Sequence, residues 1–285
     1  MINLQKISGL PILFDEKKMA LEFHGDFPFI KKSERTLDEL RPYLKNPDVK
    51  NWSNPVYHVR NGVSNMVYYV WRYVHLKKDA LKLKESNLRY DLTLIPPGEI
   101  DSEFSKTAGH FHKNKINTEL PYPEMYEVLT GRAYFLIQSP EKDLPASRQD
   151  TKNIKAVRLI EAGPGEKVLV PPQFSGHTMI NAFNEPLIMA NWISDQAVYD
   201  YNSYKNNHGA SYYLLNNDNL IDIVKNPNYD YVPEIQKMKT REYPEFGLTK
   251  NQPFYGLVNN LEKLRFLNYP EEFAGEWVKS ERASF

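Results

Sequence analysis

The chain contains no cysteine, which excludes a disulfide framework and every zinc site built on thiolates. It has no excess of charge either, because 36 acidic residues balance 36 basic ones. This balance argues against a nucleic-acid partner, which needs a basic surface, and against attachment to anionic lipid. No apolar run approaches the roughly 18–20 residues that cross a bilayer, and the first residues do not resemble a signal peptide. We therefore expect a cytoplasmic protein with no membrane and no nucleic-acid partner.

Two common catalytic signatures are also absent. The sequence has no Gly-rich phosphate loop and no serine nucleophile elbow. Aromatic residues and prolines are abundant, with 19 Tyr, 14 Phe and 20 Pro. This composition favours a turn-rich β protein.

Short segments rich in β-branched and aromatic residues, separated by turn signals, run through most of the chain and predict strands. They cover residues 11–14, 19–23, 56–59, 66–74, 90–95, 125–129, 133–137, 167–170, 178–181 and 187–193. The turn at 130–132 predicts a hairpin between its two neighbouring strands. So many short strands indicate an all-β fold, in the form of a closed sheet or jelly roll.

The two ends of the chain are predicted to contain helices as well as strands. Thr36 and Glu39 form a capping box, which predicts a short helix through about Leu44. Near the C-terminus, residues 256–268 and 272–280 look helical between prolines. We therefore predict three segments: an N-terminal strand and helix segment (1–50), a barrel with the functional site (51–228) and a partly helical appendage (229–285).

Three histidines and a glutamate are the strongest chemical signal in the sequence. His110 and His112 lie two apart on a predicted strand, so both rings project from the same face. In a barrel, His177 and a glutamate from other strands can converge on the same point. Three imidazoles and a carboxylate suit a divalent ion such as Fe, Mn, Ni, Zn or Co, and leave positions open for substrate.

Two glutamates compete for the fourth ligand position. We prefer Glu124 to Glu119, because Glu124 begins a predicted strand and an ordered strand holds a ligand better than a loop. Glu127 has the opposite strand parity and is predicted to face away from the metal.

Several motifs together resemble one known family, the cupin-type glucose-6-phosphate isomerases that are best known from archaea. The resemblance runs from about Gly9 to Asn228. Its most specific parts are Thr107-Ala108-Gly109-His110-Phe111-His112, Pro123-Glu124-Met125-Tyr126 with Gly131, Val170-Pro171-Pro172 leading to His177 and Asn181, and Asp200-Tyr201.

The resemblance implies a metal-dependent, homodimeric cupin jelly-roll barrel that interconverts glucose 6-phosphate and fructose 6-phosphate, a step of glycolysis and gluconeogenesis. The implied cofactor is one divalent metal per chain, iron first, with Mn, Zn or Ni as alternatives. The implied roles are these: metal ligands His110, His112, Glu124 and His177; catalytic residues Glu124 and Tyr126; substrate and phosphate contacts Thr93, Thr107, Gly109, Tyr126 and Tyr201.

The chain departs from the family in places that concern the substrate. Ala108 stands where the family usually has lysine, so one phosphate-binding cation is missing, and Lys106 or Lys113 is a candidate replacement. The link from His112 to Glu124 is longer by about five residues, which adds a loop over 114–121. Two other functions use the same scaffold: an iron-dependent dioxygenase, and a non-catalytic protein that binds a sugar phosphate.

Overall fold

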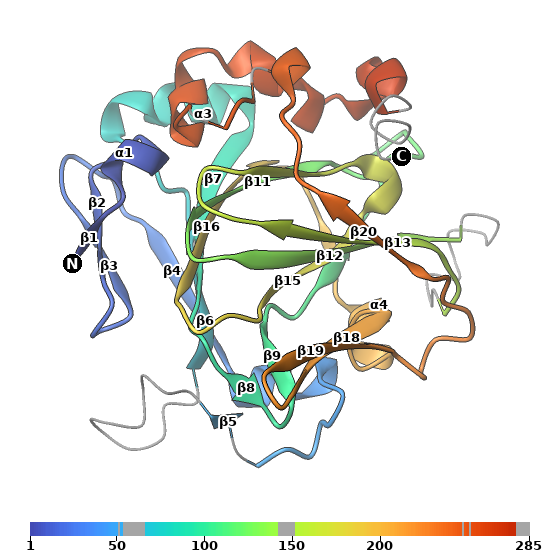
Figure 1. Cartoon of the computed structure of the whole chain (residues 1–285). Helices are drawn as coiled ribbons and strands as arrows, with labels where there is room; N and C mark the ends of the chain where they lie inside the picture. Colours follow the sequence, from blue (N-terminus) through green and yellow to red (C-terminus); the bar gives the residue numbers. More distant parts are fainter. Residues whose placement is uncertain (51, 54–65, 142–151, 247, 251, 278–285) are drawn as a thin grey trace.

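A computed structural model describes residues 1–50, 52–53, 66–141, 152–246, 248–250 and 252–277. Two large sheets face each other, one antiparallel and one antiparallel except for the parallel pair β13–β20, and a small N-terminal sheet lies beside them (Figure 1). The six-stranded sheet has the order β14 (Lys167–Val170), β11 (Glu124–Thr130), β16 (Leu187–Ser194), β7 (Leu88–Ile95), β6 (Met66–Arg72) and β4 (Lys31–Thr36). The small sheet contains β1 (Ile2–Asn3), β2 (Ile12–Asp15) and β3 (Ala20–Phe23).

The facing sheet has eleven strands. Its main path is β19 (Leu220–Lys225), β18 (Tyr212–Asn217), β9 (Glu103–Lys106), β15 (Gly176–Asn181), β12 (Ala133–Pro140), β13 (Ile154–Ala162) and β20 (Ile235–Lys239). Joined to it off this path are β5 (Trp52–Ser53), β8 (Glu99–Ile100), β10 (His110–His112) and β17 (Tyr199–Asp200). This pair of sheets is the predicted all-β, cupin jelly-roll barrel.

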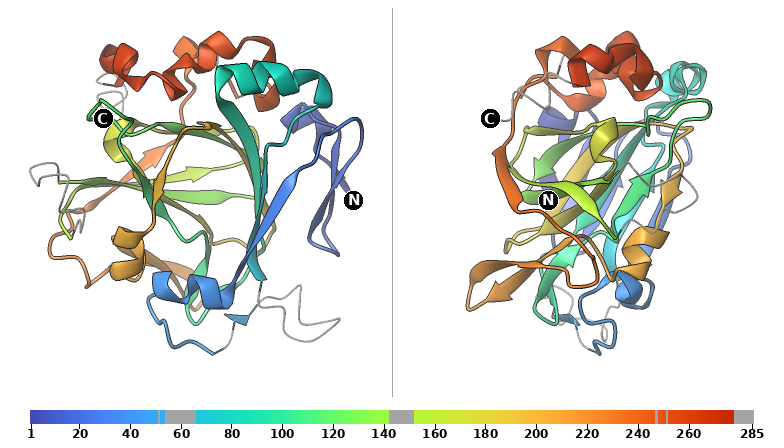
Figure 2. Two further views of the ribbon diagram at one scale, coloured as in Figure 1. Left: turned by 180° about the vertical axis from the view of Figure 1, so that it is seen from behind. Right: turned by 90° about the vertical axis from the view of Figure 1, so that its right-hand side faces the viewer.

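Helices are short and lie outside the barrel (Figures 1 and 2). The α-helices are α1 (Gln5–Ser8), α2 (Leu37–Leu40), α3 (Ala80–Ser86) and α4 (Asn202–Asn206). The 3-10 turns are η1 (Arg41–Tyr43), η2 (Lys77–Asp79), η3 (Pro172–Phe174), η4 (Pro244–Phe246), η5 (Phe254–Asn259), η6 (Leu261–Leu267) and η7 (Pro270–Phe273). Within the described part of the chain, no helix has the length and apolar character needed to span a membrane.

Most predicted strands are present, and so is the capping box. The Thr36 hydroxyl accepts a hydrogen bond from Glu39 N, and Thr36 N donates one to Glu39 Oε2, so α2 begins where predicted. The strand expected at residues 56–59 lies outside the described residues.

The hairpin predicted around residues 130–132 is wrong. β11 pairs with β14 and β16, whereas β12 pairs with β13 and β15 in the facing sheet. The intervening turn therefore crosses from one sheet to the other. Gly131 makes the turn possible: its φ is +74°, and a Cβ there would lie 2.5 Å from the Pro186 carbonyl oxygen.

The helical character expected near the C-terminus takes the form of 3-10 turns from 254 to 273, followed by α-helical residues 274–277. Asn260, with φ −150° and ψ 68°, separates η5 from η6, and Pro270 begins η7. The three-segment division remains a prediction, but both large sheets extend past its boundaries. β4 joins the six-stranded sheet before residue 51, and β20 joins β13 after residue 228.

The central strands of the six-stranded sheet are buried on both faces, so every residue of β7 and of β16 is buried. Its inner face packs inside the barrel, where the core includes Val128, Phe135, Val168 and Met189. Its outer face is covered by N-terminal and C-terminal segments, in a core that includes Leu92, Met125, Trp192, Phe254 and Trp277. Double-sided burial removes the apolar–polar alternation that a half-exposed strand shows.

A buried ion pair attaches the C-terminal segment to this outer face. Glu127 on β11 lies opposite Lys167 on β14, and their charged atoms are 2.7 Å apart with both residues nearly inaccessible. Lys167 Nζ also donates to the carbonyls of Thr249 (2.7 Å) and Gln252 (3.2 Å), and Phe254 N donates to Glu127 (3.3 Å). Burial raises the pKa of Glu127 to about 7, although Lys167 favours its charged form. Glu127 thus faces away from the metal candidates, as its strand parity predicted.

Replacing Lys167 with methionine leaves the Glu127 carboxylate buried without its cation. We expect Lys167→Met to lower the free energy of unfolding by about 3–5 kcal/mol. Urea unfolding measures the loss, and limited proteolysis reports release of the C-terminal segment. The control is Lys250→Met, which removes an exposed lysine from the same segment and should change stability by less than about 0.5 kcal/mol. Equal effects of the two substitutions would contradict the attachment.

Candidate metal centre and substrate cavity

Three strands bring four side chains to one point inside the barrel. β10 presents His110 and His112 on one face, and His110 lies directly opposite His177 of β15. Glu124 comes from the first position of β11 in the facing sheet. One ligand atom from each of the four residues lies within 4.8 Å of all the others.

The spacing of these atoms fits one shared ion. His112 Nε2 lies 3.2 Å from His110 Nε2 and 3.2 Å from Glu124 Oε2, and His177 Nε2 lies 3.3 Å from the same oxygen. Two ligand atoms bound about 2.1 Å from a metal, at tetrahedral or octahedral angles, lie roughly 3.0–3.5 Å apart. The cluster therefore has the dimensions of a mononuclear site.

Backbone carbonyls orient two of the imidazoles. Nδ1 of His112 is 2.6 Å from the Tyr122 carbonyl oxygen, and Nδ1 of His177 is 3.3 Å from that of Ser175. A carbonyl only accepts, so each Nδ1 carries the proton and each Nε2 turns a lone pair toward the cluster. This is the outer support that metal-binding histidines have in proteins.

Electrostatics also favour a cation at this point. Burial lowers the pKa of His110 and of His177, which keeps these rings neutral and able to donate lone pairs. Glu124 Oε2 is buried without a hydrogen-bond partner among the described residues. A divalent ion would satisfy this oxygen and the imidazole nitrogens together.

Glu119, the alternative fourth ligand, is exposed in the loop before β11 and is not part of the cluster. The structure brings Glu124 to the other three residues, as the sequence favoured. An outer contact that the sequence did not reveal supports Glu124: Asn191 Nδ2 on β16 donates to its Oε1 at 2.7 Å.

A cavity with about 70 Å³ of free volume adjoins the cluster and is bounded by His110 and Glu124. It is lined by all five residues predicted to contact substrate, namely Thr93, Thr107, Gly109, Tyr126 and Tyr201. Gly109 has φ +74°, and a Cβ there would collide with the Tyr204 ring and press on Thr178. Only glycine allows the backbone to turn here at the cavity wall.

Tyr126 and Tyr199 pack directly on the cluster. The Tyr126 hydroxyl is 3.0 Å from His177 Nε2, and burial raises its pKa, so the phenol stays protonated. The Tyr199 ring is 4.6 Å from that of His110, and Arg89 Nη2 donates to its hydroxyl at 2.5 Å. Tyr199 was missed in the sequence, although it lies only two residues before Tyr201.

The cations at the cavity are not the predicted ones. Lys106 is buried elsewhere, where its Nζ pairs with Glu103 and donates to the Tyr43 carbonyl at 2.8 Å. Lys113 is exposed and does not line the cavity. Arg35 of β4 and Arg72 of β6 line it instead. No local motif marks either arginine, because both reach the cavity only through strand pairing.

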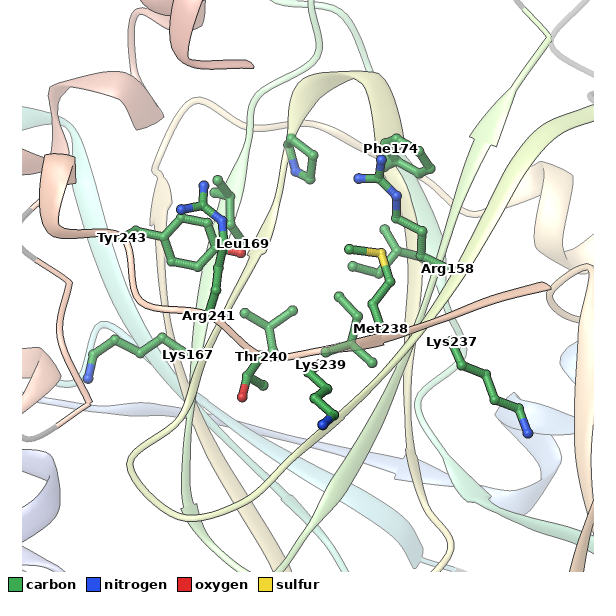
Figure 3. Close-up of a pocket in the computed structure, with 14 residues that line it drawn as sticks. Arg158, Lys167, Leu169, Phe174, Lys237, Met238, Lys239, Thr240, Arg241 and Tyr243 are labelled. Atoms are coloured by element: carbon green, nitrogen blue, oxygen red, sulfur yellow. The ribbon is translucent and has the colours of Figure 1, made fainter. Parts of the chain in front are cut away.

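A larger cavity, of about 380 Å³, lies between β13, β14 and β20 (Figure 3). Its arginines stack on aromatic rings, with Arg158 3.9 Å from the centre of Phe174 and Arg241 3.9 Å from that of Tyr243. Lys167 points out of this cavity, toward Glu127 and the C-terminal segment. None of the cluster residues lines it, so size alone does not identify the reactive site.

Known proteins resemble this chain in sequence. The family model described as Glucose-6-phosphate isomerase (GPI) matches residues 53–234. The chain is 28% identical over 208 residues to a glucose-6-phosphate isomerase of Thermococcus kodakarensis, covering 72% of this chain and 91% of the relative. It is 27% identical over 205 residues to that of Pyrococcus abyssi, covering 72% and 92%.

Similarity to solved structures is weaker. An oxalate decarboxylase variant from Bacillus subtilis is 18% identical with a TM-score of 0.31, and the match covers 47% of this chain and 28% of that chain.

Removing one imidazole should empty the centre. We expect His177→Ala to lose most of its bound divalent metal, whereas wild-type protein holds about one ion per chain. Elemental analysis after metal loading measures this, and the wild type should unfold at a higher temperature with metal than without it. The matched control is His24→Ala, which removes an exposed histidine that follows β3 and is not part of the cluster. Equal metal content in the two variants would contradict the assignment.

Proposed function

The chain belongs to the glucose-6-phosphate isomerase family, and we propose that it interconverts glucose 6-phosphate and fructose 6-phosphate at the His110–His112–Glu124–His177 cluster. One observation carries the proposal: the residues matched by the family model include the whole cluster and the five predicted substrate contacts. Family membership also leads us to propose a cytoplasmic homodimer and iron as the resident ion. The donor set of three imidazoles and one carboxylate suits iron, and also Mn, Zn or Ni.

The reaction moves a hydrogen between C1 and C2 of the open-chain sugar, and a proton between the two oxygens. A bound divalent ion supplies Lewis acidity, which acidifies a hydroxyl and stabilises negative charge on oxygen. The ligands would be His110, His112, His177 and Glu124. Everything else is performed by side chains that line the cavity.

Glu124 is the base in our proposal. Its carboxylate removes the proton from C2 of the aldose, leaving a cis-enediolate with the negative charge on O1. O1 then gains the proton that O2 loses, and Glu124 returns its proton to C1 to give the ketose. The hydrogen bond from Asn191 holds its Oε1 in place. The reverse reaction uses the same atoms in the opposite order.

Tyr126 is the second catalytic residue we propose. Its hydroxyl now donates toward His177 Nε2, whose lone pair a metal would occupy. The hydroxyl then becomes available to the substrate oxygens, and its raised pKa keeps it a proton donor. Thr93, Thr107 and the backbone N–H of Gly109 are proposed to bind the phosphate, with Tyr201 closing the opposite wall.

Metal-stripped protein should have no isomerase activity, and adding back Fe, Mn, Zn or Ni should restore it. Fructose 6-phosphate is supplied, and a coupled dehydrogenase follows glucose 6-phosphate. Metal-loaded His24→Ala should match the wild type, whereas His177→Ala should stay inactive. Absence of turnover in folded, metal-loaded wild type would contradict the proposal; oxygen consumption would then point to a dioxygenase, and sugar-phosphate binding without turnover to a binding protein.

If Glu124 is the base, substrate hydrogen should exchange with solvent. The proton resides on Glu124 after it leaves one carbon, and there it can exchange with water before it reaches the other carbon. Reaction in deuterated water should introduce deuterium at C2 of the glucose 6-phosphate formed, as nuclear magnetic resonance can measure. Complete retention of the substrate hydrogen in every turnover would show a direct hydride shift and remove Glu124 from this role.

A further inference from the structure

Two arginines enter the substrate cavity from the edge of the six-stranded sheet. Arg35 on β4 lies opposite Tyr68 on β6, and Lys31 lies opposite Arg72 in the same pairing. Side chains alternate along each strand, so Arg35, Tyr68 and Arg72 share the inner face. All three line the cavity that adjoins the metal cluster.

Strand register places the arginines on either side of Thr93. Val70 on β6 pairs with Thr93 on the neighbouring β7. Positions 68 and 72 lie two residues before and two residues after Val70, so they are the inward-facing positions that flank Thr93. Inward positions two residues apart are separated by roughly 6.6–6.8 Å. A guanidinium from position 72 and one from position 35, beside Tyr68, can therefore approach a group held at Thr93 from two directions.

Among the described residues, neither guanidinium makes a close ion pair with a buried carboxylate. Arg72 Nη1 donates to the neutral hydroxyl of Ser33 at 2.8 Å. The buried Asp91 lines the same cavity and is stabilised by the charge of Arg72, but its close ion pair is with Arg89, at 2.8 Å. Arg35 reaches Glu39 at 3.5 Å, but both side chains are more than a third exposed, so this pair is weak.

We propose that Arg35 and Arg72 bind the phosphate dianion of the sugar phosphate, together with Thr93. This inference rests on the proposed function, and adds to it a pair of cations from paired strands. β4, which carries Arg35, lies outside residues 53–234 that match the family model. The edge strand thus supplies part of the substrate specificity of this chain.

The cavity volume gives Arg35 a second part in binding. About 70 Å³ is well below the roughly 300–1,000 Å³ of typical ligand pockets, so side chains at the mouth must move to admit a sugar phosphate. Arg35 is 38% exposed and held by one surface ion pair, whereas His112, Glu124 and His177 of the cluster are buried. Arg35 moves away from Glu39 and onto the phosphate as the substrate enters.

The test compares Arg35→Gln and Arg72→Gln with wild type, all loaded to the same metal content. We expect kcat/KM for fructose 6-phosphate to fall about 10- to 100-fold in each variant, as expected for the loss of a charge-assisted hydrogen bond. Most of the loss should lie in KM, and inhibition by inorganic phosphate should weaken in parallel. Arg72→Lys should recover part of the loss, because it keeps the charge.

Lys32→Gln is the matched control. Lys32 lies on the same strand but on the opposite face, with its Nζ 4.4 Å from the centre of the Tyr69 ring. The substitution removes one positive charge from β4 without touching the cavity, so KM and phosphate inhibition should stay as in wild type. Thermal unfolding of every variant separates a local loss of binding from a loss of fold.

Two failures are distinguishable. Wild type without isomerase activity would contradict the proposed function, and calorimetric titration with inorganic phosphate would still test the arginines. Folded arginine variants with wild-type KM and wild-type phosphate affinity would overturn the inference while leaving the isomerase intact. Equal weakening in Lys32→Gln would also overturn it, because general electrostatic attraction would then explain the effect.

Discussion

The alternation of side chains along β11 is the constraint on which both the site and its support depend. Glu124, Tyr126 and Val128 point into the barrel, where they meet the metal cluster, the cavity and the inner core. Met125, Glu127 and Leu129 point the other way, into the core and ion pair beneath the C-terminal segment. A shift of register by one residue would exchange the two sets, putting Glu127 inside the barrel and Glu124 under the appendage.

Burial has opposite consequences for the charged groups on the two faces. On the outer face, Glu127 pairs with one cation, Lys167. Lys167 also donates hydrogen bonds to carbonyls of the C-terminal segment, so both charged groups have partners. Inside, Glu124 Oε2 faces the nitrogens of neutral imidazoles and has no hydrogen-bond donor of its own among the described residues. The barrel interior therefore holds a buried carboxylate oxygen and imidazole lone pairs without a donor, and a divalent ion would bind them all. This is why we place the reaction on the inner face.

The substrate cavity combines residues inside the family-model match with one strand outside it. The ligands, the threonines and the tyrosines lie within the matched residues. The edge strand β4 and its Arg35 lie outside that match and reach the cavity through pairing with β6. Because β4 carries none of the metal ligands, it contributes charge to the pocket without taking part in the metal site.

The sequence alone determined features that depend on local geometry. His-x-His on one strand face, Glu124 at a strand start, the outward parity of Glu127 and the capping box at Thr36 all follow from periods of two to four residues. Tertiary structure decided whatever depends on which strands pair. It put β11 and β12 in different sheets and buried Lys106 against Glu103. It also brought Arg35 and Arg72 to a cavity whose other lining residues include Glu124 and Tyr201, which are distant from them in sequence. Such pairings arise from packing two sheets face to face, and no local pattern records which strand will become the neighbour of which.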